Sequence, residues 1–268
     1  MGKTIGVLSL KGGVGKTSSV IALGSAIADF DKKVLLVDAN FSAPNLGLYL
    51  NIIDPPTTIH HVLKRTANIN DSIYTYRNFD VIPASIFFES NINPLKLKDK
   101  IKAVKRKYDV VLIDSSPALN EETLAAMIAS DEILVVTTPD IPTLSTTLKA
   151  VKLAKQRGIP INGLILNKVH NKNFELSMED IEKTAEVPVL AVISYSTDFL
   201  KSLSKFTPST YYKPKSKDSN EFKKLAAALI GEKYEPSKLK AFFSITPKRQ
   251  DINREIFYER VFGDSKLL

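Results

Sequence analysis

Short apolar runs rich in β-branched residues recur along this chain, separated by segments whose apolar residues repeat with the period of a helix. The runs are apolar throughout rather than alternating with polar residues, which is typical of strands covered by helices on both faces. Their alternation with helices predicts an α/β fold: a mostly parallel, doubly wound sheet flanked by helices. The predicted strands are Thr4–Leu8, Val34–Val37, Asp80–Ile82, Val110–Ile113, Ile133–Thr137, Gly163–Leu166 and Val189–Ile193. The predicted helices span residues 16–29, 97–107, 121–129, 142–157, 178–186 and 220–230.

The pattern stops after Gly231, which predicts one domain over residues 1–231 and a tail over residues 232–268. Apolar residues at helical spacing predict an amphipathic helix in this tail, and they are Ile252, Ile256, Phe257, Val261 and Phe262. Three placements stay open: the helix packs on its own domain, docks on a partner protein, or lies on a membrane surface. Glu255 and Glu259 weigh against the membrane, because interfacial helices usually carry a basic polar face.

Composition excludes several classes of protein. The chain has no cysteine, so disulfides, thiolate metal sites and cysteine nucleophiles are excluded. It has no apolar run of the roughly 18 residues that a membrane-spanning helix needs, and its N-terminus does not have the composition of a signal peptide. We therefore expect a cytoplasmic protein, with peripheral membrane association as an alternative.

Positive charge is concentrated in one part of the chain. Residues 200–248 contain 11 Lys and Arg against 4 Asp and Glu, out of a net charge of +8 for the whole chain. Such a basic C-terminal third is compatible with non-specific DNA, with an anionic membrane surface, or with a solvated face that has no partner at all.

The most informative segment is the glycine-rich run that follows the first predicted strand and opens the first helix. Its residues Gly12, Gly13, Val14, Gly15, Lys16, Thr17 and Ser18 are predicted to bind the phosphates of ATP or ADP. The glycines let backbone N–H groups turn toward phosphate oxygens, and the start of the helix adds partial positive charge. Lys16 would contact the terminal phosphates, and the Thr17 hydroxyl would bind Mg²⁺. Leu10 stands where the first glycine of the common motif belongs, and Lys11 adds an upstream lysine.

Two further strands end in aspartate. Asp38 follows Val34–Val37, and Asp114 follows Val110–Ile113. Because a carboxylate at the carboxyl end of a parallel strand faces the crevice where ligands bind, both should lie near the phosphates. Asp114 suits an outer position around Mg²⁺, and Asp38 suits a role in holding the attacking or metal-bound water.

Together these residues resemble the MinD/ParA family of deviant Walker A ATPases. The resemblance covers about residues 1–230 and is nearest to MinD-like members, and it rests on Lys11–Thr17, Asp38–Leu48, Ile113–Pro117 and Leu166–Lys168. It implies a face-to-face homodimer formed with ATP, in which Lys11 contacts the nucleotide of the partner subunit. It also implies that Asn167 contacts adenine and that residues 38–47 and 114–120 act as switch segments.

Two residues depart from the family pattern. Asn40 stands where the family usually has a second aspartate that handles the attacking water, and Ala118 stands where a glycine is frequent. An amide can orient water but cannot accept its proton, so Asn40 predicts slow intrinsic turnover, with Lys11, Lys16 and Asp38 as the other catalytic residues.

The resulting hypothesis is a dimerising switch ATPase that positions cell-division machinery or other cargo and works with a regulatory or cargo protein. Two alternatives stay open: a non-specific DNA-binding ATPase for chromosome or plasmid segregation, and an ATP-binding interaction regulator that hydrolyses little ATP. A metabolic or cluster-carrying relative is disfavoured because the chain has no cysteine.

Overall fold

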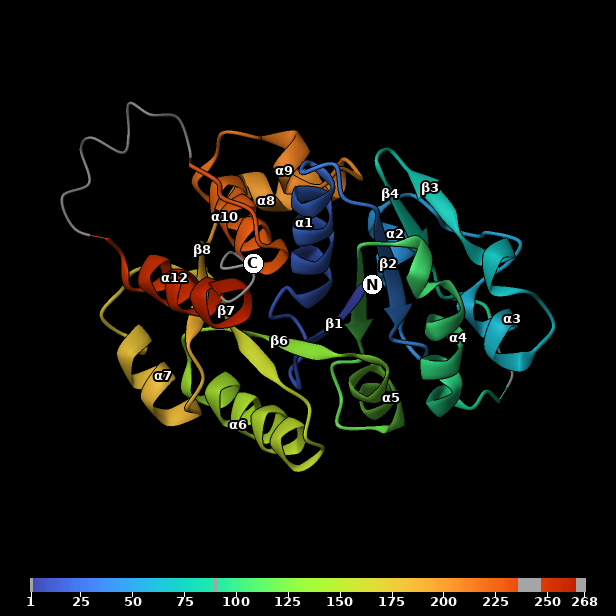
Figure 1. Ribbon diagram of the computed structural model, residues 1–268, viewed down its shortest axis with the longest axis horizontal. Coiled ribbons are helices and arrows are strands. Elements are labelled where there is room, and N and C mark those ends of the chain that lie inside the picture. The colour runs from blue at the N-terminus through green and yellow to red at the C-terminus, as the bar shows by residue number, and fades with distance from the viewer. Residues whose placement is uncertain (1, 89–90, 236–246, 264–268) are drawn as a thin grey trace.

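The computed structural model describes residues 2–88, 91–235 and 247–263. Eight strands form one sheet in the order β3-β4-β2-β5-β1-β6-β7-β8 (Figure 1). All neighbouring strands run parallel except β3, which is antiparallel to β4. The strands are β1 Lys3–Leu8, β2 Val34–Ala39, β3 Tyr74–Tyr76, β4 Phe79–Ile82, β5 Val110–Ser115, β6 Glu132–Thr137, β7 Ile161–Val169 and β8 Val189–Ser194. The predicted fold class is confirmed.

Helices cover both faces of the sheet, with α1 and α10 above it and α5, α6 and α7 below it in Figure 1. The helices on the N-terminal side are α1 Lys16–Ala28, α2 Leu46–Tyr49, α3 Ile59–Lys64, α4 Leu97–Val104 and α5 Glu121–Ala129. Those on the C-terminal side are α6 Ile141–Gln156, α7 Met178–Ala185, α8 Thr197–Ser204, α9 Ser209–Tyr212, α10 Lys217–Ile230 and α12 Arg249–Phe262.

Each face of the sheet has its own hydrophobic core. Along β2, Leu35 and Val37 pack with the helices of one face, whereas Val34 and Leu36 pack with α1 on the other. Successive residues of a strand point to opposite faces, so a strand buried on both sides must be apolar at every position. This is why the predicted strands contain uninterrupted apolar runs.

All seven predicted strands are present, each longer than predicted by one to three residues at one or both ends. The short strand β3 was not predicted, because its residues Tyr74–Tyr76 are only partly covered and form no apolar run. The helix predicted over residues 97–107 is in fact α4, which ends at Val104 and continues as a 3₁₀ turn over Lys105–Lys107. The short helices α2, α3, α8 and α9 were also missed, since few turns give little periodicity.

The helix predicted in the tail is α12, and it lies against β8 and α10. Phe257 is buried in the core shared with α1 and α10. Arg254, which is 6% exposed, donates a hydrogen bond of 2.5 Å to the carbonyl of Leu190 in β8 and one of 2.9 Å to Glu221 in α10. In the described residues α12 therefore packs on its own chain, while the domain boundary at residue 231 stays a prediction.

A search of the described residues for a helix long and apolar enough to cross a membrane found none.

Candidate nucleotide site

The glycine-rich loop occupies residues 9–15, between the end of β1 and the start of α1. Gly13 and Gly15 have positive φ angles of 79° and 90°, which residues with side chains rarely adopt. A Cβ on Gly15 would also lie 2.3 Å from the side-chain nitrogen of Asn167. No side chain of the described residues caps the first turn of α1, which leaves the backbone N–H groups at this helix start available to bind an anion.

Lys16 forms a buried ion pair with one of the two predicted aspartates. Its Nζ lies 2.5 Å from Asp114 Oδ1, and the two side chains are only 6% and 1% exposed. Asp114 Oδ2 is also buried, yet it has no hydrogen-bond partner among the described residues. Buried polar atoms are almost always satisfied, so this oxygen indicates a group that binds here. Thr17 and Lys16 line the pocket, and Asp114 lies behind Lys16, so the Thr17 hydroxyl and the Asp114 carboxylate offer oxygen ligands of the kind that Mg²⁺ prefers.

Asp38 lies next to Asp114, because the two residues are register partners on β2 and β5. Its carboxylate accepts hydrogen bonds of 3.0–3.2 Å from the backbone N–H groups of Asn40, Asn45 and Leu46. Burial, followed by the nearby charge of Asp114, raises the pKa of Asp38 to about 7, despite those hydrogen bonds. The Asp38 carboxylate thus holds the start of segment 40–46 in place, while burial and the charge of Asp114 favour its protonated form.

Asn40 is 4% exposed and lines the same pocket. Its side-chain amide donates to the carbonyl of Ala43, within its own segment. Its Oδ1 is buried without a partner in the described structure. Asn40 therefore has an acceptor oxygen with no partner among the described residues; an amide can orient a water molecule but cannot remove a proton from it.

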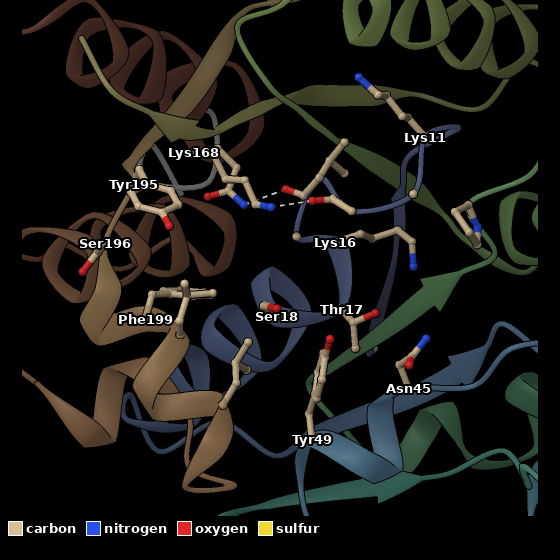
Figure 2. Close-up of a pocket in the computed structure, with 18 of the residues that line it drawn as sticks. Lys11, Lys16, Thr17, Ser18, Asn45, Tyr49, Lys168, Tyr195, Ser196 and Phe199 are labelled. Carbon is tan, nitrogen blue, oxygen red and sulfur yellow. Dashed lines mark hydrogen bonds between the residues drawn. The ribbon is translucent and has the colours of Figure 1, made fainter. Parts of the chain in front are cut away.

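Lys11 takes a different direction from Lys16. Figure 2 shows its side chain extending away from the centre of the pocket, whereas Lys16 extends within it. Lys11 Nζ lies 3.1 Å from Asp140 Oδ1 and 2.8 Å from Thr143 Oγ1, at the start of α6. Burial alone would raise the pKa of Asp140, but hydrogen bonds from two threonines and Lys11 outweigh it and lower the pKa to about 2. Lys11 thus pairs with a fully ionised carboxylate outside the pocket.

The end of β7 closes over the loop from the other side. The Asn167 amide donates a hydrogen bond of 2.7 Å to the carbonyl of Val14, and Lys168 Nζ donates one of 2.6 Å to the carbonyl of Gly13 (Figure 2). Asn167 also lines the pocket, so it lies where the sequence places a nucleotide-binding residue. Lys168 was not predicted as a site residue.

The pocket has a volume of about 300 Å³ and ends in a wall that the sequence did not predict. We call this the base wall; it consists of Ser194, Tyr195, Ser196, Phe199, Leu200 and Leu203. These residues come from the end of β8, from the connection that follows it and from α8, and Tyr49 of α2 faces them across the pocket (Figure 2). An apolar wall opposite a phosphate-binding loop provides the surface that a purine base needs. In the sequence this wall corresponds only to two apolar residues, Phe199 and Leu200, after a predicted strand. That pattern is too common to identify a binding site.

Several basic residues of the C-terminal third are neutralised within the protein. Lys213 pairs with Asp198, Lys223 with Asp29, and Lys224 with Asp251. These ion pairs reduce the positive charge that this region offers to a polyanion. Binding of DNA or of an anionic membrane through it stays a prediction.

Comparisons with known proteins agree with this geometry. The profile described as "AAA domain" matches residues 2–161. An ATP-binding protein of Methanocaldococcus jannaschii is 35% identical over 238 residues, 88% of this chain and 90% of that protein. The cell division ATPase MinD of Pyrococcus furiosus is 37% identical with a TM-score of 0.81, over 84% of this chain and 97% of that one. The chain belongs to the MinD/ParA family of P-loop ATPases.

A second MinD structure, from Pyrococcus horikoshii, was solved in complex with Mg-ADP. It is 32% identical, with a TM-score of 0.82, and the match covers 92% of this chain and 100% of that one. The residues matched by the family profile, 2–161, contain the phosphate-binding loop, Asp38 and Asp114. The base wall lies outside them. The profile therefore covers the residues at the phosphate side of the pocket. The base wall is covered by the similarity to the two MinD structures, which extends over 84% and 92% of this chain.

Proposed function

We propose that this protein is an ATP-dependent dimerising switch of the MinD/ParA type that hydrolyses ATP slowly to ADP and phosphate. The observation that carries the proposal is the buried Lys16–Asp114 ion pair at the phosphate-binding loop, in which the second Asp114 oxygen has no partner among the described residues. Nothing else in the described fold accounts for burying these charges together, since a buried ion pair is a poor way to gain stability.

In this proposal the backbone of Gly12–Ser18 and the side chain of Lys16 bind the phosphates. The Thr17 hydroxyl and, through water molecules, Asp114 would hold Mg²⁺, whose charge would neutralise charge that develops on the phosphate oxygens. The complex of a MinD relative with Mg-ADP supports this choice of ligand. Lys16 would exchange its contact with Asp114 for one with a phosphate, which frees the carboxylate for water molecules around the metal. Asn167 and the base wall hold the adenine.

Hydrolysis requires a positioned water molecule. The Asp38 carboxylate orders the segment that follows β2, and the acceptor oxygen of Asn40 has no partner in the part of the chain that the structure describes. Since phosphoryl transfer depends mainly on positioning and electrostatics, an amide at this position allows turnover but keeps it slow. The second candidate function is a regulator that binds ATP but hydrolyses almost none of it. Asn40 favours this function because an amide cannot accept the proton of the attacking water.

Dimerisation would use Lys11. Its side chain is 40% exposed and extends from the rim of the pocket toward Asp140, so it is accessible to a second subunit. In trans, Lys11 would neutralise phosphate charge in the manner of an arginine finger, after leaving Asp140. Because relatives are named as cell division and septum-site proteins, we propose that the switch acts in the cytoplasm, positions cell-division machinery or other cargo, and binds a regulatory or cargo protein.

The test measures mass in solution with ADP and with a non-hydrolysable ATP analogue, alongside calorimetric titration and phosphate release. The wild type should bind both nucleotides and dimerise only with the analogue. Lys11→Ala should keep nucleotide binding and lose the dimer. Lys149→Ala, which removes an exposed lysine of α6, is the matched control and should behave as the wild type. A wild type that stays monomeric with the analogue contradicts the switch, and a Lys11→Ala dimer contradicts the role of Lys11.

A further inference from the structure

Two separate segments form the phosphate-side wall of the pocket. The segment after β2, residues 40–46, contributes Asn40 and Asn45, and the segment after β5, residues 116–120, contributes Pro117. Backbone pairing ends with the strands, at Ala39 and Ser115. Beyond that point the two segments need some other contact if they are to move together.

Glu122, in the first turn of α5, provides such a contact. Its Oε1 accepts a hydrogen bond of 3.1 Å from the backbone N–H of Ser42 and another from the Ser42 hydroxyl. Glu122 is only 7% exposed. Its second oxygen, Oε2, is buried and has no partner among the described residues. Burying a carboxylate costs free energy of folding when one of its two oxygens has no hydrogen-bond partner. This cost indicates that Glu122 has a role other than stabilising the fold.

The same helix turn is bonded firmly to the segment after β5. Thr123 Oγ1 donates to the carbonyls of Ser116, at 3.0 Å, and Ala118, at 2.6 Å. Asn120 caps the helix by accepting from the Thr123 N–H at 3.0 Å, and its amide contacts Ser116 Oγ at 3.3 Å. Glu122 is therefore fixed to residues 116–120 on one side and to Ser42 on the other.

We propose that Glu122 is a positioning residue that makes segments 40–46 and 116–120 respond to nucleotide as one unit. The idea rests on the proposed function, because it takes the pocket to be a nucleotide site. If segment 40–46 moved alone, Glu122 would lose both hydrogen bonds from Ser42. Its buried carboxylate would then have none of the partners described above. Moving both segments together keeps the bonds, so the concerted path is favoured.

The absence of cysteine allows a direct test. Ala43 and Leu119 are exposed, one in each segment, so Ala43→Cys and Leu119→Cys each give a single attachment point for a fluorophore. Both proteins are mixed rapidly with Mg²⁺ and a non-hydrolysable ATP analogue. With Glu122 intact, the two labels should change at the same rate. With Glu122→Ala, the two rates should separate by about tenfold, the factor expected for losing a hydrogen bond to a charged acceptor.

Three further variants separate coupling from damage. Glu122→Gln keeps an acceptor for Ser42 and should restore most of the common rate. Ser42→Ala removes the hydroxyl that donates to Glu122 and should separate the two rates, but by less than Glu122→Ala does. It also tests the same contact if Glu122→Ala folds poorly. Glu121→Ala changes the exposed neighbour in the same helix turn and should leave the rates equal.

Two failures can be told apart by calorimetry on the same proteins. If all variants bind the analogue and the two labels still change together in Glu122→Ala and Ser42→Ala, the coupling role of Glu122 is wrong while the proposed function stands. Unequal rates with Glu122 intact also overturn it. If no protein releases or absorbs heat with nucleotide, the proposed function fails, and the coupling fails with it.

Discussion

The two ends of the nucleotide pocket are built in different ways. At the phosphate end the polar side chains are buried and paired, with Lys16 and Asp114 at 6% and 1% exposure. At the base end the wall is partly open to solvent, with Tyr195 at 46% and Leu200 at 49% exposure. The phosphate end stands on the central strands β1, β2 and β5, whereas the base end stands on β8, the last strand of the sheet, and on α8.

This contrast reflects what each end has to recognise. Phosphate groups carry charge, and fixed charges in a dry setting act strongly only if their positions are held by the core of the fold. A base presents a flat apolar surface, and covering it needs area rather than exact placement of polar groups. We therefore expect changes at the phosphate end to have large, all-or-none effects and changes at the base end to have small, graded ones.

The largest effect is expected for Lys16→Ala. Removing this ammonium group deprives the phosphates of their principal charge partner, so affinity for ATP and for inorganic triphosphate should fall by about 100-fold, as expected for losing a strong hydrogen bond between charged groups. It also leaves Asp114 buried beside Asp38 without its counter-ion, which should lower the free energy of unfolding by about 3 kcal/mol. Calorimetry and urea unfolding measure the two effects.

Lys149→Ala, at an exposed site on α6, should change neither quantity. Triphosphate binding that survives in Lys16→Ala would mean that the buried ion pair is structural and that the phosphates bind elsewhere.

The same contrast explains how much could be predicted from sequence. The loop at the phosphate end could be predicted from the sequence, because its glycines come shortly after a strand and Gly13 and Gly15 adopt backbone angles that other residues rarely take; that its residues bind phosphate stays a prediction. Asp38 and Asp114 were predicted because parallel strands bring their carboxyl ends to the same edge. Each of these residues is constrained by local chain geometry, which a sequence pattern can express.

The base wall could not be predicted in this way. Phe199 and Leu200 belong to a helix of eight residues, and many surface helices have two such apolar residues. Nor could the sequence reveal the contact between Ser42 and Glu122, which joins residues 80 positions apart. Interactions of this kind depend on how distant segments pack, and a single sequence carries no local pattern for them.

An effect of intermediate size is expected for the pH dependence of stability. The pKa of Asp38 is raised to about 7 in the folded protein, from an ordinary value of 3.8. The folded state therefore binds more protons than the unfolded state between about pH 4 and pH 7, so the free energy of unfolding falls as the pH rises through this window. The slope from one such group is at most about 1.4 kcal/mol per pH unit.

Asp38→Asn removes the titrating group, so its unfolding free energy should depend less on pH than that of the wild type. Urea unfolding at pH 5, 6, 7 and 8 measures the free energy of unfolding of both proteins. The value for Asp38→Asn should rise relative to that of the wild type as the pH increases. Asp54→Asn, at an exposed site after α2, should keep the wild-type slope. A difference between wild type and Asp38→Asn that stays constant with pH would place the pKa of Asp38 at its ordinary value.

The smallest effect is expected at the base end, for Leu200→Ala. Leu200 is already 49% exposed, so truncating it removes little apolar contact and should leave stability within about 0.5 kcal/mol of the wild type. If it covers the base, ATP affinity should fall by roughly three- to tenfold, the equivalent of about 1 kcal/mol of lost apolar contact. Affinity for inorganic triphosphate should not change, because that ligand has no base.

Ile252→Ala is the matched control, since Ile252 is 46% exposed and lies on α12, outside the pocket. The ratio of ATP to triphosphate affinity is the informative quantity, because a general disturbance of the fold would weaken both ligands alike. Lys16→Ala should weaken both ligands, and Leu200→Ala only the one with a base. Equal losses in Leu200→Ala would show that α8 supports the phosphate end as well, and that the two ends of the pocket are not independent.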